Sequence, residues 1–265
     1  IKKGKPMKKT ICIILIAAVA ALFCTSAYII FDHYRQDKQQ AELYDSLADM
    51  VDSAADTEEE PAEPVLYTEE KTVLPELAEL FQQNSDLAGW IRIEDTNINY
   101  PVMHTPDNPD FYLKHGFDKE YSDYGCPYVQ DNCDVQLPSD NVILYGHHMK
   151  NGSMFADLEK FKNQDFWQEH KTFFFNTVTD RYEYEIVSVF KTFVYSDSPE
   201  SFKYYHFVSA ETPEDFSAYI NRCKELALYE TGVSVEYGDK LITLSTCEYS
   251  RINGRLVVVA KRISN

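Results

Sequence analysis

Hydrophobic positions follow three patterns along the chain, and the first is an unbroken run. Residues 10–31, TICIILIAAVAALFCTSAYIIF, hold 22 positions without a charge. Such a run can cross a bilayer as a helix, because a helix rises about 1.5 Å per residue and the hydrocarbon layer is about 30 Å thick. Five lysines precede the run, and Asp32, His33 and Arg35 follow it. The positive-inside bias therefore predicts a cytoplasmic N-terminus.

A cleavable secretory signal is the competing interpretation of this run, with Thr25–Ala27 as a small-residue cleavage site. The run is longer than the apolar core of a usual signal and continues to Phe31, which favours an uncleaved anchor. We therefore expect a single-pass protein of the cell membrane. Residues 1–9 would be cytoplasmic, residues 10–31 would form the anchor, and the rest of the chain would lie outside the cell.

The second pattern is helical periodicity, which occurs on both sides of an acidic stretch. Residues 32–72 begin with weak helical periodicity and then become acidic and proline-containing, which predicts a helix followed by a solvated spacer. A folded domain is predicted over residues 73–265. Its first element is a helix, because Leu74, Leu77 and Leu80 recur at helical spacing.

From Trp90 onward the hydrophobic period is mostly two, which indicates strands. The predicted strand segments are residues 90–103, 126–130, 141–148, 172–180, 181–195, 233–237, 240–247 and 255–263. Two helices are predicted between them, at residues 152–170 and 211–230. Seven or eight short strands without regular strand–helix alternation predict a mainly β fold, either a barrel or a sandwich.

Composition narrows the possible partners and the compartment. A net charge of −18 over 265 residues argues against nucleic acid, whose phosphates would be repelled. Six cysteines are present, of which Cys12 and Cys24 lie in the apolar run. The spacing of Cys126 and Cys133 is compatible with a disulfide, but their distance is not visible in the sequence. An unpaired external thiol would then be Cys247.

Three side chains at strand ends carry candidate chemistry. Cys247 ends one predicted strand and Arg255 begins the next, so antiparallel pairing would place them side by side. A nearby cation favours the reactive thiolate, and a guanidinium can hold an oxyanion. His147 and His148 follow Gly146 at another strand exit, where an imidazole can exchange protons. A structural cysteine and solvated histidines are the alternative.

Metal binding is not expected at the histidine pair. Two adjacent histidines cannot easily share one zinc ion, and no third ligand stands at a useful spacing. The sequence therefore predicts neither a metal nor another cofactor.

Three blocks of the sequence together resemble the hallmark blocks of class B sortases. They are TLSTCEYSRINGRLVVVAKRI, ILYGHHMKNGSMFADLEKF and GWIRIEDTNINYPVMHTPDNPDFYLKHGF, in the order that the family has. The resemblance implies a closed eight-stranded sortase β-barrel with N-terminal helices, a helix inserted before the last strands and one transmembrane helix ahead of the domain. It also implies the transpeptidase chemistry of Gram-positive cell surfaces.

The resemblance also assigns roles. Cys247 would attack the threonine carbonyl of a sorting motif, His147 would act as general acid and base, and Arg255 would steady the oxyanion. Asn108 matches a family asparagine of the substrate groove. Substrate contact or rim hydrogen bonding is implied for three residues that flank the nucleophile: Ser245, Thr246 and Glu248.

One departure puts the preferred sorting motif in doubt. Some class B members have a threonine that contacts the substrate in a loop between two strands, whereas the corresponding stretch here has Val194, with Thr192 two residues earlier.

Three functions agree with these residues. The first is a membrane-anchored transpeptidase that forms a thioacyl intermediate with secreted surface proteins and transfers them to a peptidoglycan precursor. The second is a class B polymerase that joins pilins through a lysine amine. The third is a non-catalytic, sortase-like binding module, which would be expected to lack one of the three reactive residues.

Overall fold

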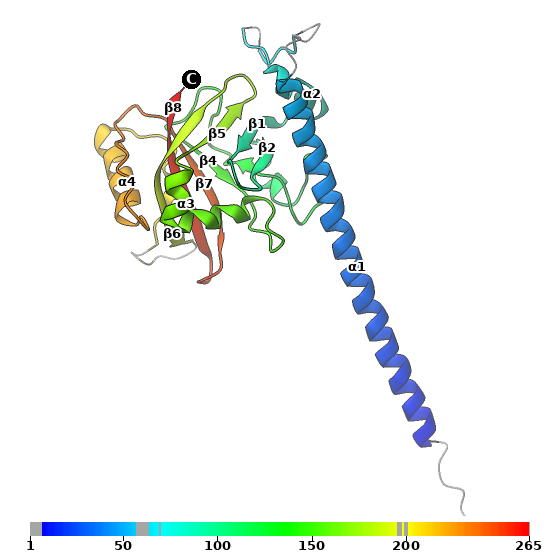
Figure 1. Ribbon diagram of the computed structural model, residues 1–265. Helices are drawn as coiled ribbons and strands as arrows, with labels where there is room; N and C mark the ends of the chain where they lie inside the picture. The colour runs from blue at the N-terminus through cyan, green and yellow to red at the C-terminus, as the bar shows by residue number, and fades with distance from the viewer. Residues whose placement is uncertain (1–6, 57–63, 69, 195–197, 199–200, 265) are drawn as a thin grey trace, which may run out of the picture. The chain divides into compact units, whose positions relative to one another are not determined.

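The computed structural model describes residues 7–56, 64–68, 70–194, 198 and 201–264. The chain divides into two compact units, residues 1–46 and residues 47–265. The described part of the first unit is helical and belongs to α1 (Met7–Ala55) (Figure 1).

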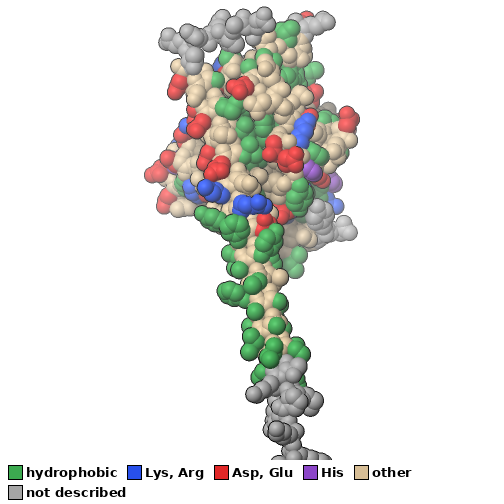
Figure 2. Space-filling model, turned by 90° about the vertical axis from the view of Figure 1, so that its right-hand side faces the viewer, with side chains coloured by type: hydrophobic (Ala, Val, Ile, Leu, Met, Phe, Trp, Pro, Cys, Tyr) green, Lys and Arg blue, Asp and Glu red, His purple; other side chains and the backbone are tan. Residues whose placement is uncertain are grey.

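The apolar stretch of α1 presents its hydrophobic side chains to the surroundings, as Figure 2 shows in green. In the described part of the chain, this is the helix whose length and composition would allow it to cross a membrane. The helix continues past the apolar run to Ala55, where the sequence predicts a helix ahead of the spacer. Residues 57–63 of the predicted acidic spacer lie outside the described residues.

The second unit contains a closed barrel of eight strands in the order β1-β2-β3-β4-β7-β8-β6-β5. Its strands are β1 (Leu87–Arg92), β2 (Asn99–Met103), β3 (Tyr128–Val129), β4 (Asn141–Tyr145), β5 (Thr172–Thr177), β6 (Glu183–Phe193), β7 (Leu241–Glu248) and β8 (Gly254–Ser264). Pairing is parallel between β2 and β3 and between β4 and β7, and antiparallel elsewhere. The predicted closed eight-stranded sortase-type barrel is confirmed.

Two strand predictions differ from the structure. Residues 90–103 contribute to two strands, β1 and β2, joined by a turn. Residues 233–237 form no strand, although their polar and apolar residues alternate. The barrel closes through eight other strands and offers this segment no free edge. The chain there is instead taken into the turn before β7, where the Asp239 N–H donates to the Glu236 carbonyl at 3.0 Å.

Helices cover the barrel and connect its strands. The α-helices of the second unit, besides the end of α1, are α2 (Pro75–Gln83), α3 (Gln164–Glu169) and α4 (Pro213–Glu225). The 3₁₀ helices are η1 (Phe111–Leu113), η2 (Phe155–Lys162) and η3 (Tyr204–His206).

The predicted start of α4 is present, because the Thr212 side chain accepts the Asp215 N–H and Pro213 stands in the first turn. The helix predicted over residues 152–170 is 3₁₀ in its first half and α-helical in its second.

Strand β8 is buried on both faces. Its residues 256–260, LVVVA, are each fully buried, because one face lies in the barrel and the other is covered by elements such as η2. Burial of each such aliphatic side chain is worth about 1.5–3 kcal/mol. This strand and β7 therefore form a rigid frame for whatever stands at their ends.

Three cysteines of the second unit are buried and form no disulfide, namely Cys126, Cys133 and Cys223. Cys126 and Cys133 form no disulfide, and their thiols donate to the carbonyls of Pro101 and Asn141 at 3.5 and 3.6 Å. Burial raises the pKa of Cys133 to about 11, which keeps the thiol protonated. Cys247, in contrast, is half-buried and free.

Candidate active site

The parallel pairing of β4 and β7 brings a histidine and the cysteine to one edge of the barrel. The two strands pair from Asn141↔Leu241 to Tyr145↔Ser245. Because parallel strands end at the same edge, the residues that follow this last pair emerge at that edge. His147 and Cys247 each lie two residues past it.

The antiparallel pairing of β7 and β8 adds the arginine. Cys247 is the direct partner of Arg255, as the sequence predicts. The Ser245 carbonyl accepts the Gly146 N–H at 3.1 Å, so the carbonyls of Ser245 and Cys247 point toward β4 rather than β8. Cys247↔Arg255 is thus a pair without hydrogen bonds between its backbones, the type in which the two side chains approach most closely.

The connection between these strands is shorter than the sequence indicates, because β7 extends through Glu248 and β8 begins at Gly254, which leaves residues 249–253 as the loop. A Cβ at Gly254 would lie 2.3 Å from the Glu248 carbonyl oxygen. Glycine therefore permits the close approach of the two strands next to Cys247.

His147 is held by a carbonyl from another part of the chain. Its Nε2 lies 2.8 Å from the Leu113 oxygen. A carbonyl only accepts, so Nε2 carries a proton, and Nδ1 is left to accept or release a second one. The backbone is fixed as well, because the Phe155 N–H donates to the His147 carbonyl at 2.8 Å.

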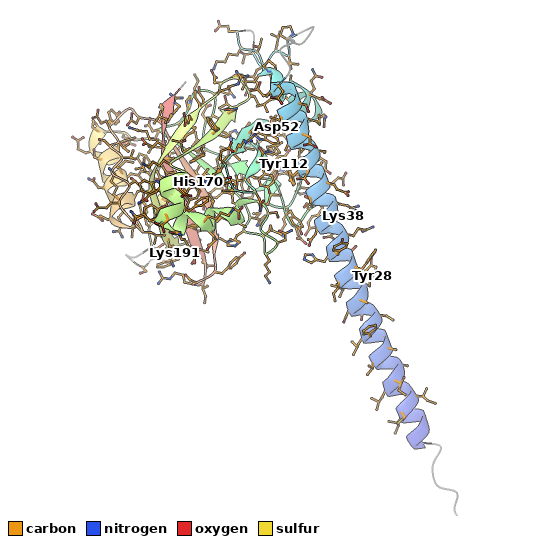
Figure 3. The ribbon with its side chains drawn as sticks, viewed as in Figure 1. Tyr28, Lys38, Asp52, Tyr112, His170 and Lys191 are labelled. Atoms are coloured by element: carbon orange, nitrogen blue, oxygen red, sulfur yellow. The ribbon has the colours of Figure 1, made fainter. Side chains whose placement is uncertain are left out.

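The Leu113 carbonyl is itself anchored through Tyr112, which is labelled in Figure 3. Tyr112 is fully buried; its hydroxyl donates to Asp86 and accepts from Asn84, both at 2.8 Å. This tyrosine fixes η1 and with it the carbonyl that orients His147. This support is not predictable from local sequence patterns, because the contact joins segments far apart in the chain.

Arg255 keeps its charge available. Its Nη1 donates to the Gly254 carbonyl at 2.9 Å. No carboxylate among the described residues lies within ion-pair distance of the guanidinium. An uncompensated guanidinium that faces a groove can stabilise a developing oxyanion.

A groove of about 570 Å³ begins at Arg255. Four tyrosines supply much of its wall, namely Tyr128, Tyr145, Tyr204 and Tyr205. The other lining residues are Pro109, Asp110, Leu113, Gln130, Asp131, Asn132, Val194 and His206. Such a mixed wall of rings and polar groups suits a short extended peptide. Tyr204 and Tyr205 are adjacent in the sequence, but only closure of the barrel brings them to Tyr128 and Tyr145.

Thr192 and Val194 have different positions around this groove. Val194 lines it, whereas Thr192 is buried and its hydroxyl accepts the Phe202 N–H at 3.1 Å. The threonine hydroxyl therefore ties the chain after β6 to the strand.

The predicted substrate-binding residues fall into two groups. Asn108 is exposed in a turn directly before Pro109 and Asp110, which line the groove. Ser245 and Thr246 are buried and bonded inside the protein. The Ser245 hydroxyl shares a 2.6 Å hydrogen bond with the Tyr204 hydroxyl, and the Thr246 hydroxyl donates to the Gly146 carbonyl at 2.8 Å.

Glu248 is also engaged internally. Its carboxylate accepts from Lys162 Nζ at 2.7 Å and from the backbone N–H of Ser250 at 3.0 Å. Burial alone would raise the pKa of Glu248, but these donors outweigh it and lower the pKa to about 2. Within the described part of the chain, no three His, Cys, Asp or Glu side chains gather as metal ligands would.

Comparisons with known proteins agree with this geometry. A family model described as the sortase domain matches residues 91–263. Sortase B of Listeria monocytogenes is 36% identical over 196 residues, which cover 72% of this chain and 76% of the relative. Sortase B of Staphylococcus aureus is 29% identical over 256 residues, 96% of each chain.

Solved structures give the same picture. A Staphylococcus aureus sortase B–substrate complex matches with a TM-score of 0.74 at 29% identity, over 87% of this chain and 99% of that one. Sortase B from Bacillus anthracis, in complex with AAEK1, matches with a TM-score of 0.71 at 28% identity, over 88% and 100%.

Proposed function

The chain belongs to the sortase family as a class B cysteine transpeptidase, and from this premise we propose that Cys247, His147 and Arg255 carry out its reaction. The observation that supports this assignment most strongly is the register of three strands. Parallel pairing up to Tyr145↔Ser245 ends β4 and β7 at one edge, two residues before His147 and Cys247, and Cys247 pairs directly with Arg255.

In the first half-reaction, the Cys247 thiolate attacks the threonine carbonyl of a sorting motif. The carbonyl oxygen becomes an oxyanion, and Arg255 stabilises it. The C–N bond then breaks, and His147 donates a proton to the leaving amine. The products are a thioacyl-enzyme and the released C-terminal part of the substrate.

In the second half-reaction, an acceptor amine attacks the thioester. His147, now neutral, takes the proton that the amine loses, and Cys247 leaves as a thiolate. The Leu113 carbonyl keeps Nε2 protonated throughout, so Nδ1 is the nitrogen that exchanges protons. Cys247 and His147 act in both half-reactions, and the second half-reaction runs the steps of the first in reverse order.

The sorting motif of a secreted protein binds in the groove lined by Arg255, and Asn108 directly precedes two other lining residues, Pro109 and Asp110. One matching structure is a Staphylococcus aureus sortase B–substrate complex, which supports a sorting-motif substrate in general. Ser245, Thr246 and Glu248 contribute mainly by holding the strands that frame the groove, since their side chains bond within the protein.

The anchor places this chemistry at the outer surface of the cell membrane. Residues 1–9 are cytoplasmic, residues 10–31 span the bilayer, residues 32–72 form an extracellular helix and acidic spacer, and residues 73–265 form the catalytic domain. The exposed apolar side chains of α1 support this assignment. The acceptor is a peptidoglycan precursor of a Gram-positive wall, with a pilin lysine as the alternative.

The test uses the full chain in detergent with a quenched fluorescent sorting peptide and several amines. We expect Cys247→Ala to abolish cleavage and transfer, and His147→Ala to lower kcat by about 10³-fold. Both variants should keep the melting temperature of the wild type. An unchanged rate in Cys247→Ala would disprove the assignment.

Mass spectrometry of the products identifies the acceptor. A product carrying a peptidoglycan-type amine supports wall anchoring, whereas a product joined to a lysine side chain supports pilin polymerisation. Failure of every peptide, together with a thiol that does not react with alkylating reagents, would favour a non-catalytic binding module.

A further inference from the structure

The end of β7 loses its strand neighbour immediately before the nucleophile. The last backbone hydrogen bond from the β4 side is the one from Gly146 N–H to the Ser245 carbonyl. The next carbonyl on that side belongs to Cys247, and it meets a side chain instead. Nδ1 of His148 lies 2.9 Å from the Cys247 oxygen.

The donor in this contact is defined by its chemistry. A carbonyl oxygen can only accept, so the hydrogen must lie on Nδ1 of His148. The imidazole therefore continues the ladder beyond the point where β4 turns away. It holds the peptide group whose rotation sets the direction of the Cys247 side chain.

The His148 ring is itself fixed from several sides. Its side chain is 18% exposed, and its Nδ1 lies 3.8 Å from a carboxylate oxygen of Glu159. The Tyr249 hydroxyl donates to the His148 carbonyl at 3.0 Å, and the two rings are 5.0 Å apart between centroids. The backbone of His148 also bridges to Met154. These contacts keep the imidazole in one orientation, so that its Nδ1–H can keep the Cys247 carbonyl in place.

We propose that His148 is a positioning residue of the transpeptidase: its Nδ1–H fixes the Cys247 carbonyl and thereby aims the sulfur between His147 and Arg255. The inference rests on the proposed function, in which Cys247 is the nucleophile. His148 does not touch the substrate. It acts through the backbone, and a misplacement of about 1 Å can cost on the order of 100-fold in rate.

Two substitutions separate the hydrogen bond from the bulk of the ring. Asparagine can place its amide N–H where Nδ1 of histidine stands, so His148→Asn keeps the donor. His148→Leu keeps much of the volume but has no donor. We expect kcat for peptide cleavage to fall about tenfold in His148→Leu and less than threefold in His148→Asn, with KM within twofold of wild type in both.

A second measurement reads the position of the sulfur without any substrate. The rate of alkylation of Cys247 by iodoacetamide, measured on the full chain at neutral pH, should fall about threefold in His148→Leu, because the sulfur is held less closely beside the Arg255 cation. His148→Asn should alkylate at the wild-type rate. This readout remains informative even if no sorting peptide is cleaved, so it distinguishes failure of this inference from failure of the proposed function.

Two results would overturn the inference. One is a lower melting temperature in both variants with wild-type kcat per titrated thiol, which would make His148 structural only. The other is a loss in both variants as large as that in His147→Ala, which would make His148 a proton-transfer group.

Discussion

Two groups of residues meet at Cys247, and they differ in how the protein satisfies their polar atoms. The reaction edge consists of Cys247, His147 and Arg255. The anchoring network consists of Glu159, Lys162 and Glu248. In the anchoring network, the Lys162 ammonium bonds both Glu159 and Glu248, at 2.6 and 2.7 Å. On the reaction edge, Arg255 has no carboxylate partner among the described residues.

Because of this difference, one group can act on the substrate and the other can stabilise the strand ends. A guanidinium that the protein leaves uncompensated can interact with the charge that develops on a substrate. A carboxylate and an ammonium that are fully bonded keep the strand ends in one position. Changes on the reaction edge should therefore lower activity and spare stability, and changes in the anchoring network should do the reverse.

Loss of the Arg255 guanidinium from the reaction edge should have a large effect on activity. We expect Arg255→Met to lower kcat/KM by about 10²–10³-fold, the usual cost of losing an oxyanion partner, while the melting temperature stays the same or rises. Peptide-cleavage kinetics and thermal unfolding of the same samples check this. Arg255→Lys is the matched control and should recover only part of the activity, because an ammonium lacks the planar fork. A large drop in melting temperature in both variants would contradict the comparison.

Glu248 in the anchoring network should show the opposite behaviour. The Glu248→Gln variant should lose about 1.5–3 kcal/mol of unfolding free energy near neutral pH, because a buried charged acceptor is lost. Its activity should change less than that of Arg255→Met. Urea unfolding and peptide cleavage, measured side by side, give both numbers.

The pH dependence of that loss follows from the pKa of Glu248. The pKa is about 2 in the fold and 4.5 for the ordinary side chain, so the folded state binds protons less readily than the unfolded state. The contribution to stability is therefore complete above pH 4.5 and disappears as the pH falls toward 2. The stability difference between wild type and Glu248→Gln should shrink across this window. A difference that is constant from pH 7 to pH 3 would count against the role of the carboxylate.

The smallest expected effects are the stability losses on replacing two lysines near the same carboxylate, and they should differ between the two. Lys162 lies 2.7 Å from Glu248 and is 28% exposed, whereas Lys191 lies 3.9 Å away and is 41% exposed. We expect Lys162→Met to cost about 1 kcal/mol and Lys191→Met less than about 0.5 kcal/mol, since exposed pairs are screened by water. Equal effects of the two substitutions on urea unfolding would mean that the network does not depend on its closest contact.

Local patterns were sufficient for much of this protein. The apolar run, the helix of residues 213–225 with its Thr212 cap and the hairpin from Cys247 to Arg255 all rest on residues close in sequence. The segment 233–237 shows the limit of such patterns. Its alternation is that of a strand, yet a strand also needs a partner, and the closed barrel has no edge left for it.

Local sequence patterns could not predict the hydrogen-bond partners of polar side chains either. Glu248 bonds Lys162, and Ser245 bonds Tyr204, across long stretches of chain. Flanking a nucleophile suggested substrate contact or rim hydrogen bonding for both residues. The structure shows that their side chains are occupied within the protein.

The sequence by itself determined the residue types, the strand ends on which they stand and the hairpin that pairs Cys247 with Arg255, because these depend on short-range periodicity and turn length. Only the tertiary structure decided that β4 and β7 pair in parallel, so that His147 and Cys247 follow strand ends at one edge, and that Leu113 and Cys247 bond different histidines. Pairing between distant strands is set by closure of the whole barrel. No single segment contains that information.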